Sequence, residues 1–488
     1  MERRKRTKIV ASVSDRRCEP EFIRELHVNG MDAVRINSAH ITLESALKLV
    51  ENIRRVSDKI PIILDTKGPE IRTTDCDEPF RVEKGREIQV VGDPDLKSSS
   101  FCIFVTYRLF GNDLAPGSSI LIDGGELELR VESKDSNMLN CIALNDGVIG
   151  SRKSVNVPKS SFSLPSVSER DREFLKFAAE NDIDFISHSF VRNRNDVLDV
   201  RAVLDEYDGK CKIIAKIENH EGVDNIDEIL DEVYGVMVAR GDLAIEMPFE
   251  KIPRIQKMII DKCIRRRKLV IVATQMLHTM INSPRPTRAE VSDIAGAIYS
   301  NTDAVMLSGE TTVGKYPVEA VRTIARVALE VEEDKDQYLE QPAGDFTGRV
   351  SAYLAKVAVK TSVNIGAKAI IADTKAGRTI RNMASYRGFR PIYAQCYSAR
   401  TMRELALSYG VYASFRDEKK TVDQFLKRAV VDITDEYEMK GDDTLVILAG
   451  NFSKGSGFSF IEVGSVDYLR EIALAGSVPE QGAGDSGG

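Results

Sequence analysis

Three charged residues interrupt or follow apolar runs that are typical of buried strands. Residues 213 to 218 read IIAKIE, and residues 235 to 242 read GVMVARGD. Because strand side chains alternate between two faces, Lys216 and Glu218 share one face, and Asp242 comes just after the next run. Burying such charges costs free energy unless they neutralise one another or serve a ligand or metal. The pattern therefore predicts either a self-satisfied ion pair in the core or a ligand or metal site at two successive strand ends.

The elements that must position these charges form a repeating pattern of strand and helix. Buried strands are predicted at residues 8–13, 33–37, 61–65, 185–189, 213–218, 236–239, 270–274 and 304–307. Amphipathic helical patterns follow most of them, for example at residues 43–56, 170–181, 255–266 and 287–298. Eight strands that alternate with helices indicate an α/β fold, a (β/α)8 TIM barrel, whose active site lies at the carboxyl ends of the strands.

Polar residues gather at the carboxyl ends of the predicted strands. In chain order they are Arg35, Asn37, Asp65, Thr66, Lys67, Ser189, Lys216, Glu218, Arg240, Asp242, Thr274, Ser308 and Glu310. These positions are where a TIM barrel keeps its catalytic groups. The fold and the charged residues therefore point to the same edge of the barrel.

Two intervals break the rhythm of the barrel, which comprises residues 1–72 and 158–332. Residues 73–157 contain short alternating runs with turn signals, such as SSILIDGGELELRVESKD, and predict an inserted all-β domain, a β-barrel or sandwich. We expect this insertion to be a lid that excludes water, although a passive decoration has the same pattern. Residues 345–475 predict a C-terminal α/β domain with strands at 369–373, 391–395, 411–415 and 444–449. Residues 476–488 are a low-complexity tail that we expect to be disordered.

A loop in the C-terminal domain has the composition of a phosphate site. Its candidate residues are Thr374, Lys375, Gly377, Arg378 and Thr379, between a predicted strand and the next helix. Small residues and cations at a helix N-terminus can hold a phosphate, and residues 450–459 (GNFSKGSGFS) could add backbone N–H groups. A Gly-containing turn is also an ordinary connection between strand and helix, so both interpretations stay open.

The composition excludes several classes of protein. The net charge of -7 argues against a nucleic-acid-binding surface. The seven cysteines are scattered and none lies in a CxxC pair, so we expect neither a disulfide framework nor a zinc site. No apolar stretch approaches the length of a membrane span, and the first apolar run is too short for a signal peptide. We expect a cytoplasmic protein with no nucleic-acid or membrane partner.

Longer motifs surround the polar strand ends. They are RIN with a following His (residues 35–40), DTKGPEIR (65–72), LPSVSERD (164–171), KIENHEGV (216–223), MVARGDL (237–243), ATQML (273–277), PRPTRAEVSD (284–293) and MLSGET (306–311). In order and spacing, over about residues 5–465, the chain resembles the pyruvate kinase family. The resemblance implies a barrel with a lid after its third strand, a C-terminal α/β domain, and phosphoryl transfer from phosphoenolpyruvate to ADP, which gives pyruvate and ATP.

The resemblance assigns roles to the charged strand ends. Glu218 and Asp242 are implied to bind a divalent metal, Mg²⁺ or Mn²⁺, since hard cations prefer carboxylate oxygens. Lys216 is implied to stabilise the transferred phosphoryl group and the enolate left behind, and Arg35 to hold the phosphate. Backbone N–H groups near Gly241 and Asp242 are implied to receive the substrate carboxylate.

The second chemical step is protonation of the enolate. The resemblance implies that Thr274 acts through a water and that Ser308 and Glu310 extend a proton relay. By itself, a threonine at a strand end is more typical of a hydroxyl bonded to the backbone.

A monovalent cation, K⁺, is implied at Asn37, Asp65 and Thr66. Members that require potassium are similar to this chain in having a glutamate at Glu70. The family's usual Asn-Phe-Ser-His reads here as Asn-Ser-Ala-His, so Ala39 lacks the hydroxyl expected of a cation ligand.

The implied nucleotide contacts are His40, Arg72, Asp123 and Arg170. Arg170 stands where the family usually has lysine, and Gly124 where it has a second aspartate. The Gly-Pro after the first strand is replaced by Ser14-Asp15. These departures affect the side of the site that receives the acceptor.

The resemblance also implies a homotetramer and a phosphorylated allosteric effector at the loop of residues 374–379. Two alternatives stay open at this point. One is a barrel lyase or aldolase that acts on phosphoenolpyruvate or pyruvate without ADP, and the other is a catalytically inactive scaffold.

Overall fold

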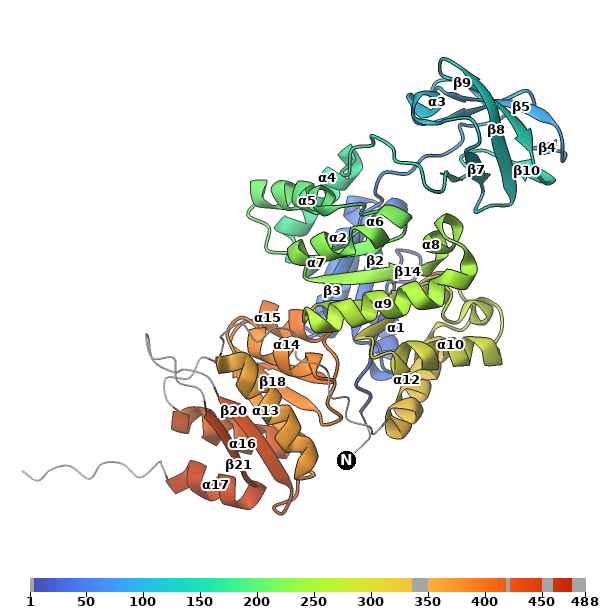
Figure 1. The fold of residues 1–488 in the computed structure, drawn as a ribbon. Coiled ribbons are helices and arrows are strands. Elements are labelled where there is room, and N and C mark those ends of the chain that lie inside the picture. Colours follow the sequence, from blue (N-terminus) through green and yellow to red (C-terminus); the bar gives the residue numbers. More distant parts are fainter. Residues whose placement is uncertain (1–3, 336–349, 418–421, 450–459, 476–488) are drawn as a thin grey trace, which may run out of the picture.

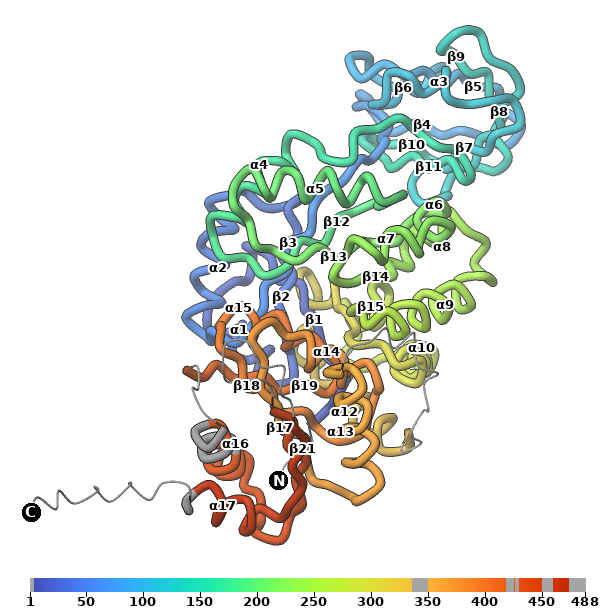
Figure 2. The backbone as a smooth tube through the Cα atoms, turned by 60° about the vertical axis from the view of Figure 1, so that its left-hand side comes forward, coloured from blue at the N-terminus to red at the C-terminus, as the bar shows by residue number. Residues whose placement is uncertain are grey.

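The computed structural model describes residues 4–335, 350–417, 422–449 and 460–475. A barrel lies in the middle of the molecule, with a small β domain at one end and an α/β domain at the other (Figures 1 and 2). The predicted loop at 450–459 and the tail at 476–488 lie outside the described residues.

Eight parallel strands close the central barrel. They are β1 (Lys8–Ser12), β2 (Ala33–Asn37), β3 (Ile62–Asp65), β12 (Phe185–His188), β13 (Lys212–Ile217), β14 (Gly235–Ala239), β15 (Leu269–Ala273) and β16 (Ala304–Leu307). β1 pairs with both β2 and β16, which completes the ring. The strands are almost entirely buried because helices cover their outer faces and side chains fill the interior. The predicted TIM barrel is confirmed.

Helices cover the outside of the barrel. They are α1 (Pro20–Val28), α2 (Leu43–Val56), α4 (Glu169–Glu180), α5 (Arg194–Glu206), α6 (His220–Asp224), α7 (Ile226–Glu232), α8 (Arg240–Glu246), α9 (Ile252–Arg265), α10 (Arg288–Tyr299), α11 (Gly309–Thr312) and α12 (Pro317–Asp334). Local sequence fixes several starts. Ser168 and Asp171 form a capping box at α4, and Asp171 also accepts the backbone N–H of Lys67 at 2.8 Å. The cap of α4 thereby holds the loop that leaves β3 toward the inserted domain.

The insertion after β3 consists almost entirely of β-strands, as expected. Its elements are β4 (Phe80–Val82), β5 (Glu87–Gly92), β6 (Cys102–Val105), α3 (Phe110–Asp113), β7 (Ser119–Ile122), β8 (Leu127–Asp135), β9 (Met138–Ala143), β10 (Gly147–Ile149) and β11 (Val155–Asn156). They form a six-stranded and a two-stranded sheet rather than one closed cylinder. Alternate residues of β5 and β9 point into a core shared by both sheets.

The C-terminal domain is a five-stranded sheet between helices. Its elements are α13 (Val350–Asn364), β17 (Ala369–Thr374), α14 (Arg378–Ser385), β18 (Ile392–Cys396), α15 (Ala399–Leu405), β19 (Val411–Phe415), α16 (Val422–Glu436), β20 (Thr444–Ala449), β21 (Phe460–Ser465) and α17 (Val466–Ala475). Four of the strands match the predicted ones. β21 was not expected because FIEVGS is neither continuously apolar nor regularly alternating, and it pairs antiparallel at the edge of the sheet.

Short 3₁₀ helices complete the barrel at Ser38–His40, Phe249–Lys251 and His278–Ile281. Among the described residues, none of the helices combines the length and the apolar character that a bilayer crossing requires.

Candidate active site

Lys216 is the buried charge at the centre of the candidate site. Its side chain lies near the carboxyl end of β13, and the residue is only 8% exposed. Its Nζ lies 3.0 Å from Glu218 Oε1 and 3.3 Å from Asp65 Oδ2. Burial alone lowers the pKa of Lys216, but the two carboxylates outweigh burial and raise that pKa above its ordinary value. The ends of β3 and β13 therefore meet around an ammonium group that stays charged.

Asp65 connects Lys216 to a second cation, Arg35. The Nη2 of Arg35 pairs with Asp65 Oδ2, and its Nη1 donates to Ser12 Oγ at 3.2 Å. Burial raises the pKa of Asp65, but Arg35 and Lys216 together hold it below its ordinary value. Two fixed cations that share one carboxylate at the same end of the barrel suit an anionic group such as a phosphate.

Glu218 and Asp242 form the candidate metal site. Glu218 is 1% exposed, and its Oε2 accepts the backbone N–H of Phe190 at 2.8 Å. Burial, opposed by Lys216 and reinforced by the nearby charge of Asp242, raises the pKa of Glu218 to about 7. Two carboxylates that repel one another in a buried site have the donor chemistry that a hard divalent cation satisfies.

The structure limits how many ligands the protein itself can give such a cation. In the parts of the chain that the structure describes, no cluster of three or more His, Cys, Asp or Glu side chains could hold a metal. Glu218 and Asp242 would therefore share the ion with water and substrate oxygens.

Thr274 sits in an unusual backbone conformation just after β15. Its φ is +70°, a value that a β-branched residue rarely adopts, and the next residue, Gln275, also has a positive φ of +56°. Arg240 holds this turn through a bond from Nη2 to the carbonyl of Thr274 at 2.8 Å and an ion pair with Asp293 at 2.6 Å. Strain of this kind persists only where the surroundings fix it, so the turn has the character of a functional site.

The hydroxyl of Thr274 is engaged with the backbone. Thr274 Oγ1 donates to the carbonyl of Ala273 at 2.6 Å and accepts the N–H of Gly241 at 2.8 Å. The Gly241 N–H, which we expected to receive the substrate carboxylate, therefore already has a partner. In this structure the hydroxyl ties the start of α8 to the end of β15.

Glu310 has a structural role in this geometry. Its two carboxylate oxygens accept the backbone N–H groups of Leu277 at 3.0 Å and Ser308 at 2.8 Å, and the residue is 3% exposed. These two contacts hold the carboxylate against the backbone, and the relay through Glu310 stays a prediction. Ser308 instead lines a cavity beside Arg35.

Buried oxygens near the ends of β2 and β3 lie where the monovalent cation was expected. Asp65 Oδ1 and Ser38 Oγ have no hydrogen-bond partner among the described residues. Asn37 Oδ1 accepts the N–H of Ala39 at 3.1 Å, and the carbonyl of Thr66 accepts Ser189 Oγ at 2.7 Å. Orphaned buried oxygens fit a cation that prefers oxygen ligands.

Comparisons with known proteins decide the family. Residues 4–321 match the model of the pyruvate kinase barrel domain, and residues 353–463 match that of the pyruvate kinase alpha/beta domain. A pyruvate kinase of Borreliella burgdorferi is 43% identical over 468 residues, which cover 95% of this chain and 98% of that protein. This chain belongs to the pyruvate kinase family. The alternatives of a lyase and of a scaffold are not favoured.

Two further members support the assignment. A pyruvate kinase of Clostridium acetobutylicum is 38% identical over 460 residues, covering 93% of this chain and 97% of that protein. The crystal structure of a pyruvate kinase from Cryptosporidium parvum superposes with a TM-score of 0.89 at 33% identity, covering 95% of this chain and 96% of that one. The pyruvate kinase architecture therefore extends over the barrel and the C-terminal domain.

The nucleotide residues expected of a pyruvate kinase divide into two groups. His40 lines a cavity of about 500 Å³ with Arg35 and Ser308. Arg170, from the first turn of α4, donates to the carbonyls of Ser38 at 2.7 Å and Ile41 at 2.8 Å. Arg170 therefore shapes the turn that presents His40.

The other two nucleotide residues are Arg72, at the junction of the barrel with the insertion, and Asp123, inside the insertion. Arg72 pairs with Glu70 at 2.6 Å and donates to the carbonyl of Arg152 at 2.6 Å. Asp123 pairs with Lys153 at 2.5 Å. No contact in the described chain joins Arg72 or Asp123 to His40, so a nucleotide shared by all of them would require the insertion to approach the barrel.

The expected effector loop forms a tight connection between β17 and α14. Gly377 has a φ of +75°, which glycine adopts without strain, and its N–H donates to Thr374 Oγ1 at 2.9 Å. Lys375 and Arg378 are exposed. The second half of the expected phosphate site, residues 450–459, lies outside the described residues.

Sequence reasoning listed Ser189 and Arg240 among the polar strand ends without giving either a role, and it missed Ser12 and Asp293, which also hold the site. Ser189 accepts the ammonium of Lys216 at 2.7 Å, and Ser12 accepts Arg35. Asp293, which anchors Arg240, lies on α10 far along the chain. The position of Ser189 at a strand end was a usable signal, whereas nothing in the sequence pattern pairs Arg240 with Asp293.

Proposed function

We propose that this chain transfers the phosphoryl group of phosphoenolpyruvate to ADP and then protonates the enolate, giving pyruvate and ATP. The observation that carries the proposal is the buried ammonium of Lys216, fixed between Glu218 and Asp65 at the carboxyl end of the barrel. Because the transferred group is highly charged, catalysis depends on fixed positive charge and on alignment of donor and acceptor.

Each residue around Lys216 has a distinct task in the proposed reaction. Arg35 and Lys216 hold the phosphoryl oxygens, and Lys216 also stabilises the enolate oxygen as the phosphoryl group leaves. Glu218 and Asp242 would hold Mg²⁺ or Mn²⁺, which neutralises phosphate charge when bound. Thr274, which Arg240 holds in position, orients the water that delivers the proton.

We also propose a K⁺ requirement. The unpartnered oxygens of Asp65 and Ser38 support a monovalent cation beside the phosphate site, together with Asn37 and Thr66. Ser38 would then supply the hydroxyl that Ala39 lacks.

We further propose that the chain works in the cytoplasm as a homotetramer and binds a phosphorylated effector at residues 374–379. The family supports all three statements. Size-exclusion chromatography with light scattering tests the tetramer. Substrate saturation with and without sugar phosphates, for the native chain and Thr379→Ala, tests the effector.

Pyruvate formation tests the reaction directly. We expect pyruvate to form from phosphoenolpyruvate only when ADP and Mg²⁺ are both present, and to fall about 100-fold to 1,000-fold in Lys216→Met. Lys257→Met, an exposed lysine on α9, is the matched control and should keep full activity. Product that forms equally well without ADP would overturn the proposal in favour of a lyase.

A further inference from the structure

His188 is a buried polar residue to which the proposed reaction gives no task. It is the last residue of β12 and is 1% exposed. Because side chains alternate along a strand, its ring lies on the face of Ile186, which packs against the helices outside the barrel. Phe185, on the other face, lies in the interior of the barrel. A histidine in such an apolar layer costs free energy unless a specific partner holds it.

The partner of His188 is the hydroxyl of Thr66, the residue that follows β3. Thr66 Oγ1 lies 2.9 Å from His188 Nδ1 and accepts the backbone N–H of Ser189 at 3.1 Å. If the hydroxyl donates to Nδ1, only the Nε2–H of the ring lacks a partner in the described chain. In the opposite tautomer both the hydroxyl proton and Nε2 would lack one, so we assign Nδ1 as the acceptor. Burial lowers the pKa of His188 to about 4, which keeps the ring uncharged.

Ser189 connects this pair to the buried ammonium of the candidate site. Its Oγ accepts the ammonium of Lys216 at 2.7 Å and donates to the carbonyl of Thr66 at 2.7 Å. The hydrogen bonds therefore run without a break from Lys216 through Ser189 and Thr66 to His188. A network in which each donor has an acceptor fixes the direction of every group in it.

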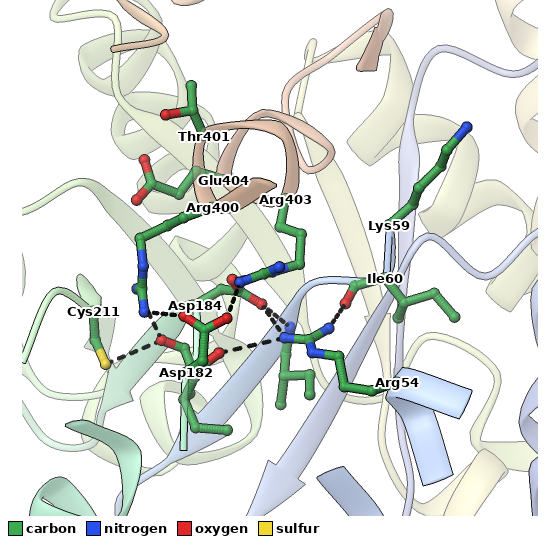
Figure 3. Close-up of polar contacts among 12 residues, drawn as sticks. Arg54, Lys59, Ile60, Asp182, Asp184, Cys211, Arg400, Thr401, Arg403 and Glu404 are labelled. Atoms are coloured by element: carbon green, nitrogen blue, oxygen red, sulfur yellow. Dashed lines mark hydrogen bonds and ion pairs between the residues drawn. The ribbon is translucent and has the colours of Figure 1, made fainter. Parts of the chain in front are cut away.

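The start of β12 is fixed without His188. Figure 3 shows Arg54 and Arg403 converging on Asp184, which directly precedes the strand. Arg403 Nε lies 2.6 Å from Asp184 Oδ1, and Asp184 Oδ2 accepts the backbone N–H of Ile62, at the start of β3, at 2.9 Å. β3 and β12 are thus joined separately at their two ends. A substitution of His188 should loosen the active-site end and leave the other end in place.

We propose that His188 is a positioning residue for the phosphoryl-transfer site, which holds Thr66 and Ser189 where K⁺ and Lys216 require them. The inference rests on the proposed function, because that function assigns Thr66 to K⁺ and Lys216 to the phosphoryl group. His188 touches neither of them directly. An outer contact of this kind orients a ligand group, and its loss typically lowers metal affinity or activity about 10-fold to 100-fold.

Two substitutions of similar shape test the hydrogen bond. Leucine cannot accept a hydrogen bond, whereas the side-chain oxygen of asparagine can lie near the position of Nδ1. We expect His188→Leu to raise the K⁺ concentration for half-maximal pyruvate formation and to lower kcat, each about 10-fold, with the KM for ADP unchanged. His188→Asn should recover most of both losses. His27→Leu is the control, because it removes a ring on α1 whose Nδ1 lies 2.9 Å from the carbonyl of Met31, and it should match the native chain.

A double-mutant cycle separates positioning from a general loss of packing. Thr66→Val cuts the same hydrogen bond from the other side, so it should reproduce the change in K⁺ dependence. Adding His188→Leu to Thr66→Val should then have little further effect. Losses that multiply in the double variant overturn the proposal, as does a His188→Asn variant that is as impaired as His188→Leu.

Thermal unfolding tests the same contact without turnover. KCl should raise the thermal midpoint of the native chain relative to tetramethylammonium chloride at equal ionic strength, since an ion that binds the folded chain stabilises it. His188→Leu should reduce this rise and His188→Asn should keep it. No rise in the native chain, or an equal rise in all three chains, overturns the inference. The expected thermal pattern without any ADP-dependent pyruvate supports the role of His188 and counts against the proposed reaction alone.

Discussion

The ammonium of Lys216 lies 3.0 Å from the carboxylate of Glu218, two positions along the chain on the same face. The proposed phosphoryl-binding cation and the proposed metal ligand are therefore fixed relative to one another by strand geometry. Without a metal, Glu218 has a pKa raised to about 7 by burial and by Asp242. A bound divalent cation would offset the free-energy cost of keeping Glu218 charged, so protons and metal compete for Glu218 near neutral pH.

Replacing Glu218 tests the metal site. In Glu218→Gln we expect the Mg²⁺ concentration for half-maximal pyruvate formation to rise about 10-fold to 100-fold, because a charged ligand is lost. In the native chain the same concentration should fall as pH rises from about 6 to 8, whereas the variant should lose this pH dependence. Glu173→Gln, on the exposed face of α4, is the control. An unchanged Mg²⁺ requirement in Glu218→Gln would rule out Glu218 as a ligand.

Arg240 is proposed to act through Thr274, whose carbonyl it binds at 2.8 Å. Arg240→Met should release the strained turn and lower kcat about 10-fold to 100-fold, the scale of a small misplacement near the reacting atoms. Arg240→Lys should recover part of the loss by keeping the ion pair with Asp293. Steady-state kinetics separate this role from a structural one, because kcat should fall while the KM for ADP stays constant. A loss of folded protein without a change in kcat would contradict it.

The barrel was predictable because its strands are short, continuous apolar runs. The charged residues were predictable as site residues because they lie at the carboxyl ends of those strands, where a TIM barrel has its active site. Lys216, Glu218 and Asp65 follow from that pattern. The bonds of Arg240 to Asp293 and to Thr274 do not, since they join residues far apart in the chain whose side-chain directions no periodicity encodes. The contacts of Glu310 were not predictable either, because no sequence pattern indicates that its carboxylate accepts the backbone N–H groups of Leu277 and Ser308.

Ser38 is expected to replace a hydroxyl that the family places one residue later. Its Oγ is buried without a partner in the described chain, as is Asp65 Oδ1. Ser38→Ala should therefore raise the K⁺ concentration needed for half-maximal activity about 10-fold, since a cation ligand is lost. Pyruvate formation titrated with K⁺ measures this effect, and Ser308→Ala is a comparison that should leave the K⁺ curve in place. If Ala39→Ser changes the K⁺ titration curve and Ser38→Ala does not, Ser38 is not a K⁺ ligand.

Lys8 provides a test of stability against pH. It is 2% exposed at the start of β1, donates to the carbonyl of Val411 at 2.6 Å, and has a pKa lowered by burial to about 8. Between that value and the ordinary lysine pKa of 10.5, the unfolded chain binds more protons at this position than the folded chain. The contribution of Lys8 to the free energy of unfolding must therefore rise with pH in this window, by up to about 1.4 kcal/mol for each pH unit.

Lys8→Met should lack that rise, because the variant has no proton to release at this position. Urea unfolding of the native chain and of the variant at about pH 7.5 and about pH 10 measures the difference, and groups other than Lys8 cancel in the comparison. The free energy of unfolding of the variant, relative to that of the native chain, should be higher at the lower pH than at the higher pH. Lys59→Met, at an exposed position, should keep a constant offset from the native chain at both pH values. If the free energy of unfolding of Lys8→Met also differs from that of the native chain by the same amount at both pH values, Lys8 keeps its charge on folding. The ammonium of Lys8 would then bind the carbonyl of Val411 in its charged form and so join the barrel to the C-terminal domain.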